Sequence, residues 1–444
     1  MARRLVNPLH KCEKTLTTGR EASRRVSFRA LWLRPQSRML WQAAIFTISS
    51  ALVSLLSLVS TALLARHLST HAFGSYSFSL ASLQLAAIVF EFGLFASAAR
   101  LVALEATLDK REVIGAALLL YLPVGTVFSL FVFASSFGVD AWFQTEAGMA
   151  LRIAAPLAIA IPFAYILQQL AQGAGRLHVA SISALLMQVL LVAFLAVFVG
   201  FGGELTTGRG LVLRCAAALV AALAASLWLR PLFRQLRRSL MEILVHTRHY
   251  GFQVYVGRLL SIGTYNMDVL MIGVLANVNS VGVYTLAGSV AGAAGLPVMG
   301  MSAALFARMA NTPRIKLRWV YASIGIGALT TLTAWALADA FVSFAFSSRY
   351  GRAADLVLPL AVAQAVRGVT TVYNTFLSAH GRGRELRNAG LVLTGSNIAF
   401  NFTLIPPFGA MGAAWASLFA LIVNLIAHVI FYRQSLRLPT QVEG

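Results

Sequence analysis

The chain has 444 residues, of which 58% are hydrophobic and only 11% are charged, and its formal net charge is +21. Because soluble domains carry about 25% charged residues, this composition excludes an ordinary soluble protein and indicates a polytopic membrane protein. The positive charge does not indicate a nucleic-acid-binding protein, since the basic residues separate hydrophobic segments and do not share one surface.

The predicted fold class is all-α, with twelve transmembrane helices in two pseudo-symmetric six-helix bundles. A bilayer core of about 30 Å requires roughly 20 apolar residues per helix. The segments that meet this requirement are residues 39–65, 74–101, 113–137, 148–172, 177–201, 209–233, 250–276, 282–308, 316–345, 354–379, 386–405 and 409–432.

The stretch before the first of these segments, residues 1–38, is polar and basic. It lacks the short apolar core of a secretory signal, so we predict a cytosolic tail, with binding to anionic lipid headgroups as the alternative.

The connectors alternate between rich and poor in Arg and Lys along the chain. Basic loop residues stay on the cytoplasmic side, so both termini are predicted to be cytoplasmic. Residues 235–249 are predicted to link an N-terminal lobe, residues 39–234, to a C-terminal lobe, residues 250–432, with a cytosolic C-terminus at 433–444. The linker could form a short interfacial helix or a plain tether.

Two short motifs recur at a constant spacing. Phe73-Gly74-Ser75-Tyr76 corresponds to Val281-Gly282-Val283-Tyr284, and Gly173-Ala174-Gly175-Arg176 corresponds to Gly381-Arg382-Gly383-Arg384. The offset is 208 for both pairs (282 − 74 and 384 − 176). Six helices in each half would give both copies the same orientation, as in a parallel repeat whose substrate site lies between the halves.

Ionisable residues inside apolar segments are candidates for function, because a charge in hydrocarbon is costly unless it faces a cavity or a partner. Arg258 and Arg367 are predicted to line a substrate cavity, with a structural interhelical pair as the alternative. Asp268 is the candidate for binding a proton or a sodium ion. Arg152 and Arg214 lie near the outer ends of their segments, where an arginine can extend to lipid headgroups.

Further polar residues lie deeper in the segments. Glu91 is interpreted either as a structural lock between the halves or as a second ion-coupling carboxylate. Interhelical hydrogen bonding is the usual role of intramembrane amides and imidazoles, and Asn374 is the one assigned to substrate binding. The other residues of this kind are Asn397, Asn401, Asn424 and His428.

Signatures of enzymes are missing from the sequence. It contains no P-loop, no Cys/His spacing typical of a metal site and no nucleophile elbow. We therefore expect no catalytic residues, no metal and no cofactor.

The motifs together resemble the O-antigen and exopolysaccharide flippases of the multidrug/oligosaccharidyl-lipid/polysaccharide exporter superfamily. The resemblance is carried by Leu63 to Leu68, Phe73 to Tyr76, Glu91 to Leu94, Gly173 to Arg176 and Asp268 to Tyr284. It implies two six-helix lobes around a cavity that opens alternately to each side of a bacterial inner membrane. Asp268 and Glu91 match acids that such flippases carry in helices seven and two.

The activity implied by the resemblance is the translocation of a lipid-linked oligosaccharide for surface polysaccharide biosynthesis. A pyrophosphate headgroup needs cationic partners, and the planar fork of arginine suits phosphate oxygens. The alternatives are a multidrug cation antiporter of the same superfamily and a membrane polymerase or ligase of the same pathway. Expected partners are the lipid-linked substrate, membrane lipids, H⁺ or Na⁺, and a polysaccharide polymerase or export protein.

Overall fold

The computed structural model describes residues 35–104, 109–143, 147–310 and 312–437. Side chains are described for these residues except 35–47, 142, 143, 249, 253, 257, 258, 260–265, 299, 300, 302–308 and 310. The chain divides into two compact units, residues 1–42 and 43–444, of which the second holds nearly all of the described residues.

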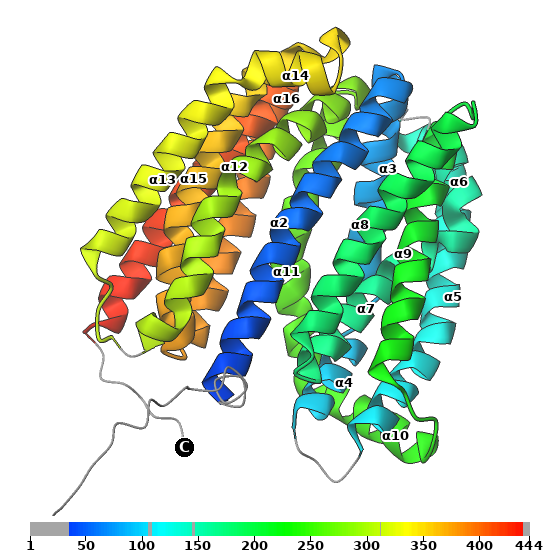
Figure 1. Cartoon of the computed structure of the whole chain (residues 1–444), viewed down its shortest axis with the longest axis vertical. Coiled ribbons are helices and arrows are strands. Elements are labelled where there is room, and N and C mark those ends of the chain that lie inside the picture. Colours follow the sequence, from blue (N-terminus) through cyan, green and yellow to red (C-terminus); the bar gives the residue numbers. More distant parts are fainter. Residues whose placement is uncertain (1–34, 105–108, 144–146, 311, 438–444) are drawn as a thin grey trace, which may run out of the picture. The chain divides into compact units, whose positions relative to one another are not determined.

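All secondary structure in the described residues is helical (Figure 1). The helices of the N-terminal half are α2 (Pro35–His67), α3 (Thr70–Val89), α4 (Leu94–Ala103), α5 (Lys110–Phe143), α6 (Ala147–Ala158), α7 (Ala160–Gly173), α8 (Leu177–Gly200) and α9 (Thr207–Leu229). Within this half α5 packs on α6, α8 packs on α9, and α9 also contacts α6 and α7.

The C-terminal half follows a short helix that joins the halves. Its elements are α10 (Leu236–His246), a π-helical turn η1 (Thr247–Gly251), α11 (Phe252–Leu275), α12 (Val278–Ala310), α13 (Leu317–Ala336), α14 (Ala338–Ala345), the 3₁₀ turn η2 (Ser348–Tyr350), α15 (Arg352–Ala379) and α16 (Gly383–Ser435). In this half α15 packs on α12, α13 and α16, and α11 packs on α16.

Three predicted segments are broken helices. Segment 74–101 is divided into α3 and α4 around Phe92 and Gly93, whose φ angles are +48° and +73°. The pair α6 and α7 bends by 46°, and α13 and α14 by 57°. Pro162 explains the second break, because it lacks the N–H that would bond to the carbonyl of Ala158, the last residue of α6.

Two other predicted segments are separated by a kink and not by a loop. Residues 386–405 and 409–432 both belong to α16, whose 53 residues are interrupted only by the non-helical Gly409, with φ 56° and ψ −132°. A Cβ on Gly412 would overlap the carbonyl oxygen of Leu404, so the chain turns sharply at Gly409 and the two parts of α16 are separate helices. Glycine suits this position because its φ is positive.

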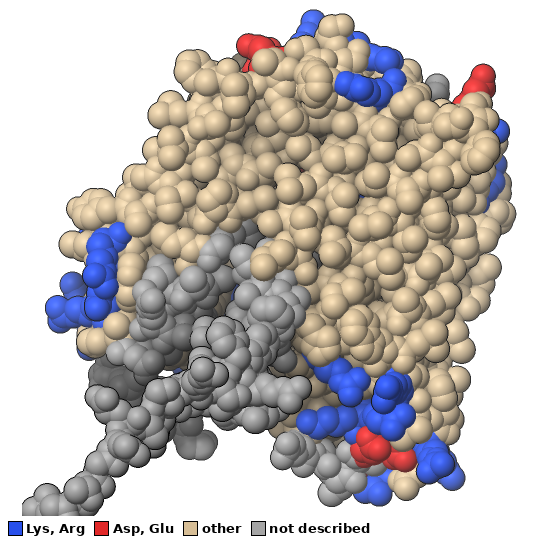
Figure 2. Space-filling model, in the orientation of Figure 1, with Lys and Arg blue, Asp and Glu red and all other residues tan. Residues whose placement is uncertain are grey.

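The molecule is a polytopic membrane protein. Eight helices of the described residues are long and apolar enough to span a bilayer, or up to ten if each bent pair counts as one span. The finer prediction, twelve spans in two bundles of six, stays a prediction. On the face shown in Figure 2, Lys and Arg gather at the two ends, and the surface between them is largely uncharged.

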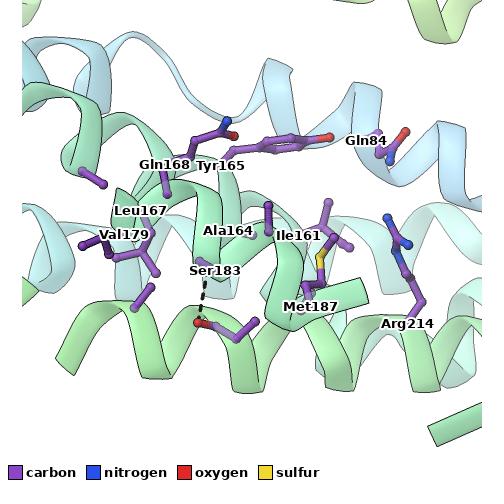
Figure 3. A pocket seen from close by; sticks show the side chains of 16 residues that line it. Gln84, Ile161, Ala164, Tyr165, Leu167, Gln168, Val179, Ser183, Met187 and Arg214 are labelled. Atoms are coloured by element: carbon purple, nitrogen blue, oxygen red, sulfur yellow. Dashed lines mark hydrogen bonds between the residues drawn. The ribbon is translucent and has the colours of Figure 1, made fainter. Parts of the chain in front are cut away.

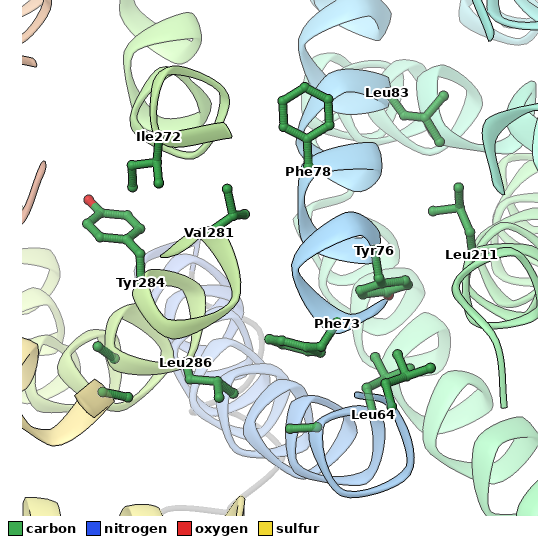
Figure 4. Packing of buried hydrophobic residues seen from close by; sticks show 14 of the residues in the cluster. Leu64, Phe73, Tyr76, Phe78, Leu83, Leu211, Ile272, Val281, Tyr284 and Leu286 are labelled. Atoms are coloured by element: carbon green, nitrogen blue, oxygen red, sulfur yellow. The ribbon is translucent and has the colours of Figure 1, made fainter. Parts of the chain in front are cut away.

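Helix α3 connects the two halves. It packs against α9 on one side and against α11 and α12 on the other. Side chains from all these helices form one buried cluster, shown in Figure 4, to which α3 contributes Phe73, Tyr76 and Phe78 and α12 contributes Val281 and Tyr284. The core of the protein therefore lies at the junction of the halves as well as within each half.

The first repeated motif lies at this junction. A Cβ on Gly74 would overlap the backbone carbonyl of Val278, and one on Gly282 would lie 3.3 Å from the nitrogen of Gly74. The two copies of the motif therefore face each other, and glycine at both positions allows α3 and α12 to approach closely.

The second repeated motif is shifted in the structure. Arg176 N–H bonds to the carbonyl of Ala171, and Arg382 N–H bonds to that of Leu377, so the helix ends correspond at an offset of 206 (382 − 176). Gly175 and Gly381 hold the matching positions of positive φ, again 206 apart (381 − 175). The sequence match at 208 is therefore two residues out of structural register.

Candidate functional site

Asp268 is the centre of a buried polar cluster in the C-terminal half. Its carboxylate is 7% exposed and accepts hydrogen bonds from four neutral side chains. Oδ1 accepts from Asn397 Nδ2 at 3.0 Å and Asn401 Nδ2 at 2.7 Å. Oδ2 accepts from the hydroxyls of Tyr284 at 2.8 Å and Ser417 at 2.5 Å. We call these five residues the Asp268 cluster.

Three helices build the cluster. Asp268 lies on α11 and Tyr284 on α12, whereas Asn397 and Asn401 precede Gly409 on α16 and Ser417 follows it. The asparagines are four residues apart, so they lie one above the other on one face of the helix. The kink at Gly409 turns the chain so that both parts of α16 reach the same carboxylate.

The cluster holds a carboxylate without a cationic partner. No Lys or Arg side chain that the structure describes forms an ion pair with Asp268, and the Asn401 Oδ1 atom is buried without a hydrogen-bond donor. A buried carboxylate saturated by neutral donors keeps its charge uncompensated. Such a group, beside a carbonyl oxygen that has no partner, can take a proton or a hard monovalent cation with oxygen ligands.

The predicted arginines do not join this cluster in the part of the chain that is described. Arg258 lies on α11, ten residues before Asp268, but its side chain is outside the described residues. Arg367 is half-buried on α15. A Cβ on Gly295 of α12 would lie 3.3 Å from Gln364, and a Cβ on Gly368 would overlap Val298 of α12. This part of α15 is therefore packed against α12.

Asn374 belongs to a different group of polar residues. Its Nδ2 lies 3.3 Å from Nε2 of His428, whose Nδ1 lies 2.9 Å from the carbonyl oxygen of Asn424. His428 is 3% exposed, and the side-chain oxygen of Asn424 is buried without a donor. This group joins α15 to α16 and is separate from the Asp268 cluster.

Glu91 lies in the N-terminal half, at the break between α3 and α4. It is 6% exposed and lines a small cavity of ≈ 10 Å³ with Phe128 of α5 and Pro162 and Tyr165 of α7. Irregular backbone at membrane depth is tolerated only where protein buries it or a cavity meets it. The two predicted ion-coupling acids therefore occupy separate sites in opposite halves.

Arg214 does not lie where its depth in the sequence segment predicts. Snorkelling to headgroups was expected, but the side chain lines a cavity enclosed by α3, α7, α8 and α9 (Figure 3). Its Nη1 donates to Oε1 of Gln188 at 3.0 Å. Arg152, the other outer arginine, stacks on Phe137 with its Cζ 3.8 Å from the ring centroid. Depth along a helix does not reveal that Arg214 faces inward.

A family model described as "Polysaccharide biosynthesis protein" matches residues 40–312, which is more than half of the chain. The chain belongs to this polysaccharide biosynthesis protein family. No curated protein matches the sequence significantly.

Solved structures share the fold of this polysaccharide biosynthesis protein. "Lipid II flippase MurJ, inward closed conformation" has a TM-score of 0.69 at 12% identity and covers 88% of this chain and 87% of its own. An inward-facing multidrug resistance MATE family transporter of the MOP superfamily has a TM-score of 0.68 at 16% identity, over 88% and 96%. An outward-facing MATE transporter has a TM-score of 0.58 at 16% identity, over 92% and 97%.

The residues around Asp268 in this polysaccharide biosynthesis protein are only partly visible in the sequence. Asn397 and Asn401 are polar residues inside an apolar segment, and their spacing of four places them on one face. Tyr284 is recognisable only as part of a repeat, and Ser417 was missed, although Asp268 needs both hydroxyls. The solved structures that share the fold of this chain are a lipid II flippase and multidrug transporters.

Proposed function

We propose that the chain translocates a polyprenyl-pyrophosphate-linked oligosaccharide across the inner membrane by alternating access, as a step of surface polysaccharide biosynthesis. The observation that carries this proposal is membership of the polysaccharide biosynthesis family over residues 40–312. The fold shared with a lipid II flippase supports it, since that protein's name describes the flipping of a lipid.

The Asp268 cluster is proposed to couple transport to H⁺ or Na⁺. Each asparagine can rotate its amide and present oxygen in place of NH₂, which would give a cation the Asp268 carboxylate, two amide oxygens and the hydroxyl of Ser417. Oxygen ligands of this kind suit a hard cation. Protonation of Asp268 would instead remove the uncompensated charge directly.

Arg258 and Arg367 are proposed to bind the pyrophosphate, with Asn374 as a further substrate contact and Glu91 as a second coupling acid. Arginine forms paired, charge-assisted hydrogen bonds with phosphate oxygens. Both arginines stand on the helices of the C-terminal half that flank α12, and α12 meets α3 at the junction of the halves.

A multidrug cation antiporter is the second candidate. The observation that favours it is the fold shared with MATE transporters, whose TM-scores nearly equal that of the lipid flippase. The two candidates carry substrates of opposite charge, since a drug cation is positive and a pyrophosphate is negative. Deletion of the gene distinguishes the two functions, because loss of a flippase affects surface polysaccharide and loss of an antiporter affects resistance to cationic drugs.

The proposed function predicts that a deletion strain loses surface polysaccharide and accumulates lipid-linked units on the inner leaflet. When the deletion strain expresses the Arg258→Ala or the Arg367→Ala variant, surface polysaccharide should not return. Expression of Arg209→Ala, which changes an exposed arginine on α9, should restore it. Immunoblots of the membrane fraction control for protein amount. Full polysaccharide in the deletion strain together with increased sensitivity to cationic drugs would support the antiporter instead.

A further inference from the structure

A second polar site lies inside the N-terminal half, in the cavity that Arg214 lines (Figure 3). The cavity has a volume of ≈ 110 Å³, which is enough for several water molecules. Most of its wall is aliphatic. The polar residues that line it are Gln84 of α3, Tyr165 and Gln168 of α7, Ser183 of α8 and Arg214 of α9.

Arg214 carries a charge that the described protein does not neutralise. Its one hydrogen bond is to the neutral amide of Gln188, and its Nε is buried without an acceptor. No described carboxylate forms an ion pair with it. An uncompensated cation out of water is costly, and an anion in the adjoining space would remove much of that cost.

The other polar groups of the cavity can also donate. Within the described residues the amides of Gln84 and Gln168 form no hydrogen bond with protein, whereas the Ser183 hydroxyl donates to the carbonyl of Ala221 at 3.3 Å. Figure 3 shows Gln84 and Arg214 near one end of the cavity. A cation and free amide N–H groups around one space match a ligand that accepts hydrogen bonds.

The repeat gives an independent comparison between the halves. Tyr284, which donates to Asp268, corresponds to Tyr76 at the 208 offset (284 − 76). The Tyr76 ring packs on α9 at Gly210, one turn before Arg214 and on the same face. Equivalent tyrosines therefore accompany Asp268 in the C-terminal half and Arg214 in the N-terminal half, neither of which forms an ion pair with a described side chain.

We propose that the Arg214 cavity is an anion-binding site that takes a phosphate or carboxylate group. Arg214 and Gln84 bind the oxyanion, and Gln168, which Figure 3 shows toward the other end of the cavity, donates to a hydroxyl farther along the ligand. The site is distinct from the Asp268 cluster and does not depend on the proposed flippase function. The same oxyanion chemistry is found in an anionic lipid headgroup and in an acidic or phosphorylated sugar.

The test is thermal unfolding of the purified full chain in neutral detergent at constant ionic strength. The probes are inorganic phosphate, glucuronate, and mixed micelles with phosphatidylglycerol or phosphatidylcholine. The wild type should show a saturable Tm rise of about 2 °C or more with at least one anionic probe, and none with phosphatidylcholine. Phosphatidylglycerol alone would identify a lipid headgroup, and phosphate or glucuronate a soluble group.

Arg214→Met provides the discriminating variant. Without anions it should be at least as stable as the wild type, because it replaces an uncompensated charge by a side chain of similar size. With anions it should show no Tm rise, whereas Arg209→Gln, on the same helix but exposed, should respond as the wild type does. The same rise in Arg214→Met, or no rise in the wild type with any anion, would overturn the proposal.

Cysteine reactivity gives a second readout. Ser183→Cys in a Cys12→Ser, Cys215→Ala background should react several-fold faster with an anionic than with a cationic methanethiosulfonate, because the Arg214 charge lines the same cavity. Arg214→Gln should remove this preference. Equal rates with Arg214 intact, or no reaction with either reagent, would contradict an accessible anion site.

Discussion

At the scale of single residues, the Asp268 cluster combines a buried acid with donors that are all neutral. A hydrogen bond to a charged group contributes about 1.5–3 kcal/mol, so four of them hold the carboxylate firmly without cancelling its charge. An ion pair would fix the carboxylate in one state. Neutral donors leave the charge uncompensated, which is what the proposed coupling to a cation or a proton requires.

Asp268→Asn should abolish polysaccharide output while leaving the protein in the membrane, because the amide cannot hold a cation or release a proton. If sodium is the coupling ion, NaCl should raise the Tm of the wild type above its value in choline chloride, and this difference should vanish in the variant. Asp355→Asn, an exposed acid in the first turn of α15, is the matched control. Wild-type output from Asp268→Asn would refute the coupling role.

Tyr284→Phe removes one donor from Asp268 and should lower the free energy of unfolding by about 1–3 kcal/mol. Tyr76→Phe is the matched control, since the Tyr76 hydroxyl makes no hydrogen bond within the described residues. Denaturant or thermal unfolding measures both. Equal losses in the two variants would show that the hydrogen bond to Asp268 contributes little.

The sequence indicated Asp268 as a candidate functional residue but did not indicate which side chains surround it. A carboxylate inside an apolar segment is visible in the sequence, because its burial is costly wherever it points. Its partners on α12 and α16 could not be assigned, since they depend on which helices meet and how each is rotated. The inward orientation of Arg214 was missed for the same reason.

At the scale of elements, the break between α3 and α4 is the least regular part of a span. Phe92, a bulky residue, and Gly93 both have positive φ, and Gly93 lies against the backbone of Gly251 in η1. The Tyr255 hydroxyl donates to the carbonyl of Val89 at 2.8 Å, which satisfies an acceptor that the break leaves free. The end of α3 is thereby joined to the start of α11.

Gly93→Ala should destabilise the protein by about 1–2 kcal/mol from the left-handed backbone alone, and further through overlap with the Gly251 carbonyl. Gly288→Ala is the matched control, because this helical glycine has no atom near the place of a Cβ. It should be stabilising by about 0.5–1 kcal/mol. Thermal unfolding measures both, and a neutral Gly93→Ala would show that the break tolerates other conformations.

Hydropathy located the apolar segments but not their breaks. A window of apolar residues has the same mean hydropathy whether the helix inside it is straight or bent. Pro162 was a visible signal for the bend after α6, but Phe92 gave none, since bulky residues disfavour positive φ. Pro406 and Pro407 indicate a loop when read locally, and the structure places the turn directly after them, at Gly409.

At the scale of the whole second unit, the halves are joined at both ends of the helices. At one end, Arg66 donates to the carbonyls of Phe344 and Ala345, and Arg349 donates to those of Leu68 and Arg66. We call these contacts the arginine latch. At the other end, the Arg100 guanidinium lies 3.9 Å from the ring centroid of Tyr250.

Loss of the arginine latch should shift the equilibrium between the closed and the open state at this end of the molecule. Replacing Arg66 and Arg349 by Ala should remove about 1 kcal/mol per hydrogen bond and favour opening at that end by tenfold or more. Alkylation of a Val278→Cys probe, buried beside Gly74, measures the opening. Arg209→Ala should leave the rate unchanged, and no acceleration in the double variant would mean that apolar packing alone closes this end.

The acceptors of the arginine latch are all main-chain oxygens, whereas its donors are two specific side chains. Saturation mutagenesis should therefore give different results on the two sides of the contact: the exposed Phe344 should tolerate many replacements, whereas Arg66 and Arg349 should tolerate few. A substitution at a residue whose main-chain carbonyl accepts the hydrogen bond keeps that carbonyl, so it requires no compensating substitution at Arg66 or Arg349. Covariation statistics would thus overlook a contact that sets how readily the two halves separate.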